Sequence, residues 1–170
     1  MKRIKSVPLR KTPDLMLLRR FPLIPQRTAW TCGPAVVCAV SSFIGKYTAS
    51  EKDAALWMNT NKIHGTTPAN MKSFLIDVCK VNVQMRRRTP LFTVRKAIDQ
   101  GNPVIVLWND WKGHWAVVVG YGKGHLLLAD PANSVSGLRL HKASTFRKHW
   151  HAKVAGTSYH QLALICTRKP

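Results

Sequence analysis

Apolar residues recur at helical spacing between residues 32 and 101 of the chain. In four segments they return every three or four positions, which is typical of helices that turn one face to a core. Helix start and stop signals bound these segments, among them Ser50, Pro68, Pro90 and Gly101. We therefore predict helices over residues 32–45, 54–58, 67–78 and 89–101.

The hydrophobic pattern changes after Gly101. Short runs of β-branched or aliphatic residues follow, separated by glycine and polar turns, which is typical of buried strands. They predict strands over residues 103–108, 114–120 and 125–129, then a helix near 144–150 and a last strand near 159–165. Helices first and a largely antiparallel sheet second predict an α+β fold.

The first predicted helix carries a cysteine at its N-terminal edge. Cys32 is followed by Gly33 and by Pro34, a residue that suits the first turn of a helix. A thiol becomes a good nucleophile as the thiolate, and a helix N-terminus stabilises that anion with its free N–H groups and aligned peptide dipoles. Cys32 is therefore a candidate nucleophile.

Three further side chains could complete a cysteine hydrolase site. His114 begins a predicted strand and could act as the base, and Asp130 ends the next strand and could orient the imidazole. Gln26, upstream of Cys32, could donate an amide N–H to a developing oxyanion. Asp110 lies nearer to His114 in sequence, but it falls in a loop, and Asp130 is preferred partly on the resemblance described next.

Three motifs resemble those of the bacteriocin-processing cysteine peptidases, the double-glycine leader peptidases of family thirty-nine, and their stand-alone papain-like relatives. The motifs are Pro-Gln-Arg-Thr-Ala-Trp-Thr-Cys-Gly-Pro-Ala from residue 25, Gly-His-Trp-Ala-Val-Val-Val-Gly-Tyr from residue 113, and Leu-Ala-Asp-Pro-Ala from residue 128. Supporting segments, including Gly-Thr-Thr-Pro from residue 65, extend the likeness over residues 23 to 166. The resemblance implies a papain-like fold, a triad of Cys32, His114 and Asp130, Gln26 in the oxyanion hole, and no metal or organic cofactor.

The chain is strongly basic. It has 27 Lys and Arg residues against 7 Asp and Glu, a formal charge of +20 and a sequence pI of about 10.6. Such a field attracts anionic partners, so an acidic protein or a nucleic acid could bind the basic surface. We expect a basic N-terminal arm over residues 1–22 and a papain-like peptidase domain over residues 23–170.

Neither a signal peptide nor a transmembrane segment is expected, which favours a cytoplasmic protein, although delivery to another cell or compartment stays open. The four cysteines form no Cys-x-x-Cys pair, consistent with a reducing compartment. Cys38, Cys79 and Cys166 are expected to pack in the core, and His149 and His151 to have surface or packing roles.

The sequence as a whole predicts a cysteine peptidase or amide hydrolase that acts on a peptide or protein through a thioester. An amine could resolve the same thioester, so a transferase stays open. Two alternatives remain: a delivered effector or toxin domain with the same chemistry and an acidic neutralising partner, and a basic nucleic-acid-binding protein on a papain-like scaffold.

Overall fold

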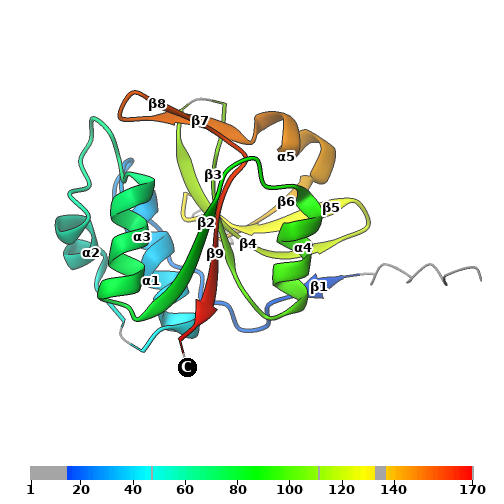
Figure 1. Ribbon diagram of the computed structural model, residues 1–170, viewed down its shortest axis with the longest axis horizontal. Helices are drawn as coiled ribbons and strands as arrows, with labels where there is room; N and C mark the ends of the chain where they lie inside the picture. Colours follow the sequence, from blue (N-terminus) through cyan, green and yellow to red (C-terminus); the bar gives the residue numbers. More distant parts are fainter. Residues whose placement is uncertain (1–14, 47, 111, 133–136, 170) are drawn as a thin grey trace, which may run out of the picture.

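The computed structural model describes residues 15–46, 48–110, 112–132 and 137–169. Most helices precede most strands along the chain, as the hydrophobic pattern predicts (Figure 1). The helices are α1 (Cys32–Ile44), α2 (Glu51–Trp57), α3 (Pro68–Asp77), α4 (Leu91–Asp99) and α5 (Ala143–His149). The strands are β1 (Met16–Leu17), β2 (Val81–Arg86), β3 (Val104–Trp108), β4 (His114–Gly122), β5 (His125–Ala129), β6 (Leu138–Lys142), β7 (His151–Val154), β8 (Thr157–His160) and β9 (Leu162–Arg168).

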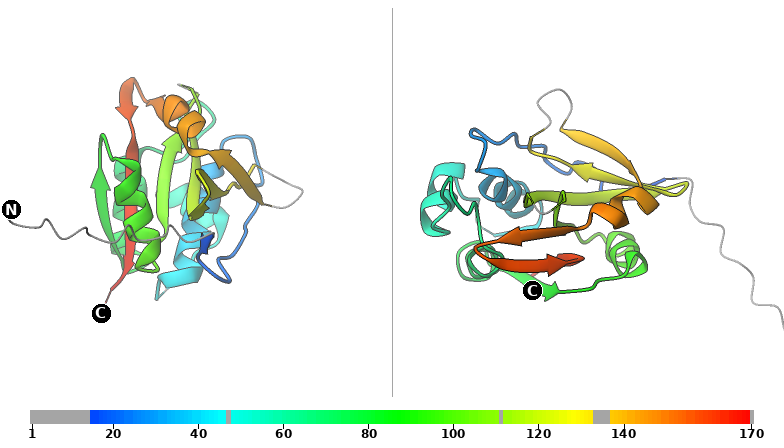
Figure 2. Two further views of the ribbon diagram at one scale, coloured as in Figure 1. Left: turned by 90° about the vertical axis from the view of Figure 1, so that its right-hand side faces the viewer. Right: turned by 90° about the horizontal axis from the view of Figure 1, so that it is seen from above.

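The main sheet is antiparallel and confirms the α+β prediction. Its strands follow the order β2-β9-β3-β4-β5-β6, with β1 paired to β4, while β7 and β8 form a separate hairpin. The central strands β3 and β4 are buried along nearly their whole length, because helices cover both sides of the sheet. Figures 1 and 2 show α1 and α4 on opposite sides.

Helix α1 is the most deeply buried helix among the described residues. Most of its side chains are inaccessible to solvent, because α2 and α3 cover it on one side and β4 on the other. Ser50 caps α2 by accepting a hydrogen bond from the Asp53 amide, and Thr67 caps α3 in the same way with the Asn70 amide. None of the helices that the structure describes is long and apolar enough to cross a membrane.

Four described strands were not predicted from the sequence: the outer strands β2 and β6 of the main sheet, the short strand β1, and β7. Both outer strands expose polar residues to solvent, so their sequences lack the continuous apolar run of a buried strand and resemble loops. The strand predicted near residues 159–165 is present but is not continuous: Gln161 has a φ of 48°, a left-handed conformation that divides the segment into β8 and β9.

The expected basic arm lies mostly outside the described residues. From Leu15 onward the chain follows β4: β1 pairs Met16 with Tyr121 and Leu17 with Gly120, and Leu18 and Phe21 are buried. A Cβ at Gly120 would lie 2.6 Å from the Met16 carbonyl oxygen, so this approach requires glycine. The boundary at residue 23 stays a prediction.

Candidate active site

Cys32 is the first residue of α1, as the sequence predicts, and only 7% of its surface is exposed. The hydroxyl of the preceding residue, Thr31, does not cap the helix. Its Oγ1 instead accepts a hydrogen bond from the Thr28 amide at 3.0 Å. Pro34 has no N–H and the Ala35 N–H donates to the Thr31 carbonyl oxygen, but the N–H groups of Cys32 and Gly33 have no partner within the helix. They are therefore available to a negative charge at the cysteine.

His114 and Asp130 meet at the end of the central sheet. Strands β4 and β5 pair antiparallel, with Val117 opposite Ala129, so the start of one strand lies beside the end of the other. His114 Nε2 lies 2.7 Å from Asp130 Oδ1. The sequence could not bring these two residues together, because their contact depends on the register of the two strands.

Asp110, the alternative acidic partner for His114, contacts two other histidines instead. Its carboxylate lies 2.6 Å from His149 Nδ1 and 3.5 Å from His151 Nε2, and half of its side chain is exposed. His149 and His151 are therefore surface partners of Asp110. The preference for Asp130 over Asp110 at His114 agrees with this geometry.

The electrostatics favour a charged imidazole at His114. Burial lowers the pKa of His114, but hydrogen bonding to Asp130 and Cys32, and the negative charges of both, raise it to about 9. Because Asp130 contacts Nε2, the other ring nitrogen, Nδ1, remains for Cys32. A thiolate at Cys32 and an imidazolium at His114 would stabilise each other.

Asp130 is buried, with 2% of its surface exposed, but several donors surround it. Burial would raise the pKa of its carboxyl. The hydrogen bond and charge of His114, the Ala132 amide at 2.9 Å and the Arg139 charge outweigh burial and lower this pKa below its usual range. Arg139 Nε lies 3.2 Å from Oδ2. Asp130 is thus held as an anion in contact with His114.

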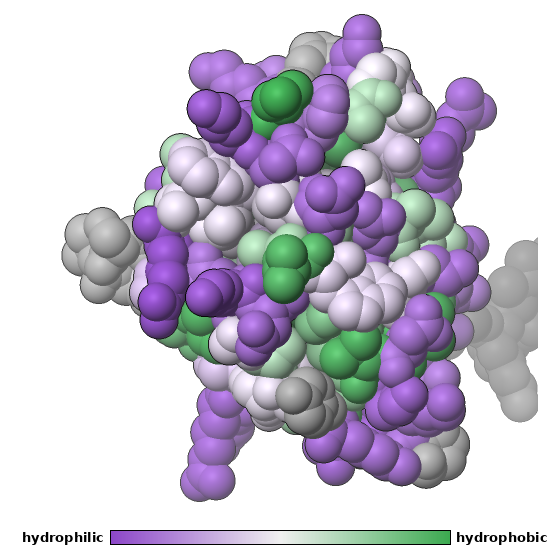
Figure 3. Space-filling model, turned by 90° about the vertical axis from the view of Figure 1, so that its left-hand side faces the viewer, coloured by the Kyte–Doolittle hydropathy of each residue, from purple (hydrophilic) through white to green (hydrophobic). Residues whose placement is uncertain are grey.

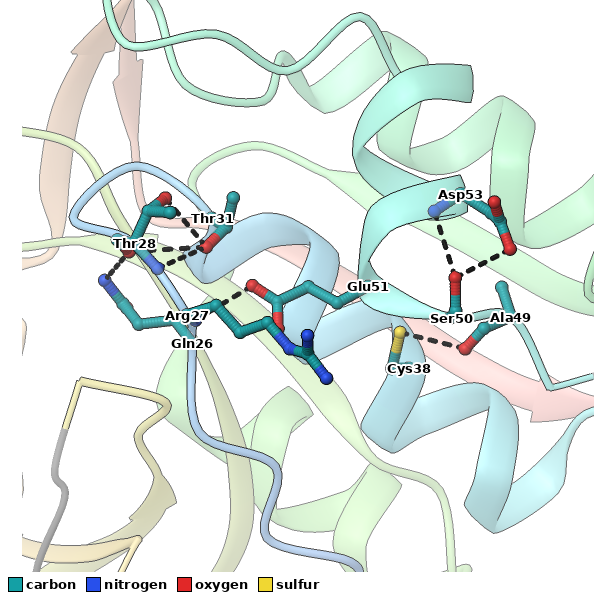
Figure 4. Close-up of polar contacts among 9 residues, drawn as sticks. All are labelled: Gln26, Arg27, Thr28, Thr31, Cys38, Ala49, Ser50, Glu51 and Asp53. Atoms are coloured by element: carbon teal, nitrogen blue, oxygen red, sulfur yellow. Dashed lines mark hydrogen bonds and ion pairs between the residues drawn. The ribbon is translucent and has the colours of Figure 1, made fainter.

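Gln26 lies in the loop before α1, beside Thr28 and Thr31 (Figure 4). Its Nε2 donates to the Thr28 carbonyl oxygen at 2.7 Å, and its backbone N–H donates to the Pro131 carbonyl oxygen at 3.0 Å, next to Asp130. Among the described residues no hydrogen bond joins Gln26 to Cys32 or His114. One side-chain N–H is used by Thr28, which leaves the second for another acceptor.

Cys32 and His114 open into a cleft of about 210 Å³. One wall is the loop between α2 and α3, and the other comes from the start of β4 and from the β7–β8 hairpin. Trp115 and Gly33 position the loop: Trp115 Nε1 donates to the Thr66 carbonyl oxygen at 3.0 Å, and a Cβ at Gly33 would lie 2.3 Å from Thr66 Oγ1. The face that carries α2 and α3 is mostly hydrophilic, with apolar side chains scattered over it (Figure 3).

A known family matches most of this sequence. The sequence matches the Peptidase_C39 like family over residues 18–157. The chain belongs to this family. It is a cysteine peptidase with a papain-like fold, and the resemblance drawn from its motifs is confirmed.

Solved structures share the fold of this peptidase at low sequence identity. The peptidase domain of Streptococcus ComA, a bifunctional ABC transporter of a quorum-sensing pathway, is 22% identical with a TM-score of 0.69, covering 88% of this chain and 99% of that one. A double-glycine-motif protease from an AMS/PCAT transporter, solved with its leader peptide, is 19% identical with a TM-score of 0.66, covering 87% and 91%. A Carica candamarcensis cysteine protease is 11% identical with a TM-score of 0.62, covering 93% and 100%. No curated protein matches the sequence at a significant level.

Three further residues, to which the sequence analysis gave no role, support the site of this peptidase. Arg139 pairs with Asp130 from β6, Trp108 faces His114 across the β3–β4 pair with ring centroids 6.4 Å apart, and Thr66 packs on the helix at Gly33. The alternating pattern of residues 138–142 could have revealed β6, and the Gly-Thr-Thr-Pro segment already pointed to Thr66.

The other three cysteines of the peptidase are buried away from the cleft, as predicted. Burial, with smaller contributions from nearby acidic groups and thiols, raises the pKa of Cys38 to about 12. Burial also raises the pKa of Cys79 to about 11, and that of Cys166 further. Among the described residues no group of three or more His, Cys, Asp or Glu side chains could hold a metal ion.

Proposed function

We propose that this peptidase hydrolyses a peptide bond through Cys32 as nucleophile, His114 as acid and base, and Asp130 as the residue that orients the imidazole. The observation that carries the proposal is the contact of 2.7 Å between His114 Nε2 and Asp130 Oδ1. Asp130 and Cys32 both raise the pKa of the His114 imidazole. Cys32 begins a buried helix, and a helix N-terminus favours the thiolate.

In the acylation step the Cys32 thiolate attacks the carbonyl carbon of the scissile bond, and a C–S bond forms. The carbonyl oxygen takes up negative charge. As the C–N bond breaks, the His114 imidazolium donates its proton to the leaving amine. The products are a free amine and a thioester on Cys32.

In the deacylation step water attacks the thioester. His114, now neutral, takes a proton from the water, and the C–S bond breaks to release a carboxylic acid and the Cys32 thiolate. Asp130 holds the ring in one tautomer through both steps, because its carboxylate accepts from Nε2. The imidazolium is restored at the end of the cycle.

Gln26 is proposed as a donor to the oxyanion. Its second amide N–H and the backbone N–H of Cys32 would supply the two donors that a tetrahedral intermediate needs. Its backbone bond to Pro131 links the glutamine loop to the segment that carries Asp130, which supports a shared site. Losing one such donor costs about 100- to 1000-fold in kcat.

The substrate is proposed to be a peptide or a protein. A leader peptide accompanies the double-glycine-motif protease described above, and a cleft of about 210 Å³ lies beside Cys32. The alternatives of a delivered effector with an acidic partner and of a nucleic-acid binder stay predictions.

The test is cleavage of an internally quenched peptide library by the purified protein and by its Cys32→Ala variant. Cys38→Ala is the matched control, because Cys38 lies on the same helix but is buried and bonded to the Ala49 carbonyl oxygen. We expect Cys32→Ala to abolish turnover, Cys38→Ala to retain it, and mass spectrometry to detect an acyl adduct on Cys32 alone. Undiminished cleavage by Cys32→Ala would overturn the proposal.

A further inference from the structure

The two walls of the cleft that holds Cys32 and His114 both carry positive charge. Lys62 comes from the loop between α2 and α3, Lys112 from the turn before β4, and Lys153 from β7. All three side chains are exposed. Segments far apart in the sequence therefore bring three lysines to the lining of one cleft.

Negative charge is absent from the described lining of this cleft. The nearest acidic residue in sequence, Asp110, pairs with His149 and His151 and lies outside the lining. Among the described residues no ion pair involves Lys62, Lys112 or Lys153. The described lining of the cleft beside Cys32 thus carries three lysines and no acidic residue.

Electrostatic focusing is strongest in such a setting. A cleft lined by charges of one sign concentrates counter-charged solutes near its floor and raises their rate of encounter. The attraction falls with ionic strength over a Debye length of about 8 Å at 0.15 M salt. A carboxylate on the substrate would gain from all three lysines, whereas a cationic side chain would be repelled.

We propose that Lys62, Lys112 and Lys153 select substrates that carry a carboxylate close to the scissile bond. The proposal rests on the proposed function, since it concerns what enters the cleft of Cys32. The carboxylate could be an Asp or Glu side chain or the C-terminal carboxylate of a peptide. Both have the same charge and would meet the same ammonium groups.

The first experiment compares two small alkylating agents of similar size, anionic iodoacetate and neutral iodoacetamide, on the whole protein. The rate constants for labelling Cys32 are measured by mass spectrometry, and the iodoacetate rate constant is divided by the iodoacetamide rate constant. This ratio is then normalised by dividing it by the same ratio measured for a small neutral thiol. We expect a normalised ratio of at least about threefold at 50 mM salt, falling toward one at 500 mM. A ratio of one or less at low salt overturns the proposal.

Charge-reversal variants separate the lysines from the His114 imidazolium, which also attracts anions. The test variant replaces the cleft lysines in Lys62→Glu/Lys112→Glu/Lys153→Glu. The matched control makes the same charge change at exposed lysines outside this cleft, in Lys96→Glu/Lys142→Glu/Lys148→Glu. We expect the test variant to lose most of the iodoacetate preference and the control to keep it; an equal loss in both would refute a role for these three lysines.

The second experiment uses peptides to find the source of the carboxylate. One set carries Asp or Glu at each of six positions around the scissile bond with an amidated C-terminus, a second carries Asn or Gln instead, and a third is neutral with a free C-terminus. Preference for the first set identifies a side chain, and preference for the third identifies a terminal carboxylate. Equal cleavage of all three overturns the selection.

The two proposals fail differently. If Cys32 is not the nucleophile, neither alkylating agent labels it faster than the small thiol. If Cys32 is the nucleophile but the lysines do not select, both agents label it quickly, and the cleft variant keeps the same iodoacetate preference as the control variant.

Discussion

The interaction of His114 with Asp130 predicts a large effect of Asp130→Asn on the imidazole. The pKa of His114 lies at about 9, against 6.5 for an unperturbed histidine. At 1.36 kcal/mol for each unit, the net preference for the imidazolium is about 3 kcal/mol. Burial opposes this preference, so Asp130 and Cys32 together must contribute more than the net value.

Asp130→Asn keeps an oxygen that can accept from Nε2 but removes the charge. Only 15% of the His114 side chain is exposed, so solvent screens the lost charge little. We expect the pKa of His114 to fall by at least about 1 unit, which is the usual effect of an adjacent buried charge. Peptidase activity should fall as well, because the thiolate–imidazolium pair is then less populated at neutral pH.

The assay is an NMR titration of the histidine Cε1–H signals from pH 5 to 10, with the His114 signal assigned by its absence in His114→Gln. Asp110→Asn is the matched control, because Asp110 contacts His149 and His151 instead. Cys32→Ala, titrated alongside, separates the thiol from the carboxylate in this coupled system. A His114 pKa that changes by less than about 0.3 units in folded Asp130→Asn would refute the electrostatic reasoning.

The same shifts predict how stability depends on pH. A histidine with a raised pKa in the folded state contributes its full stability below about pH 6.5 and loses it as the pH rises through about 9. Asp130, with a lowered pKa, contributes above its unperturbed value of 3.8 and loses that contribution as the pH falls through its folded pKa. The stability advantage of the wild type over Asp130→Asn should therefore be largest between about pH 4 and 6.5, measured by urea unfolding, and a difference that does not vary with pH would contradict this.

Two further predictions concern packing and thiol reactivity. Gly33→Ala should destabilise the protein by about 1–3 kcal/mol, because the new Cβ would lie 2.3 Å from Thr66 Oγ1. Thermal unfolding measures this loss. If that contact is the cause, the double variant Gly33→Ala/Thr66→Gly should lose less stability than the sum of the two single variants. In the native protein iodoacetamide at pH 8 should label one cysteine quickly, Cys32, since burial raises the pKa of the other three thiols. Fast labelling of Cys38, measured by peptide mass spectrometry, would contradict the buried positions.

Much of the fold could be predicted from local patterns. The helix that begins at Cys32 has its proline in the first turn and apolar residues on every side, and both features depend only on neighbouring residues. The same holds for β3 and β4, whose continuous apolar runs match burial on both faces. The outer strands β2 and β6 were missed because one face of each meets solvent.

The candidate site could be predicted in its parts but not in its geometry. The sequence identified Cys32, His114, Asp130 and Gln26 as separate motifs. The sequence could not exclude Asp110, because Asp110 is nearer to His114 along the chain than Asp130 is. Which carboxylate reaches the imidazole depends on how the strands pair. The pairing of Val117 with Ala129 decides it in the structure.

The sequence by itself determined the chemistry that this chain can carry: a thiol at a helix start, an imidazole and carboxylates at strand ends, and a large positive charge. Residue types and their short-range spacing can be taken directly from the sequence, because the side-chain periodicity of a helix or a strand extends over only a few residues. Only the tertiary structure decided that Asp130 faces His114 and that Lys62, Lys112 and Lys153 share one cleft. His114 and Asp130 are 16 positions apart, and the three lysines lie still farther from one another in the sequence. These arrangements form through strand register and packing, which no local pattern specifies.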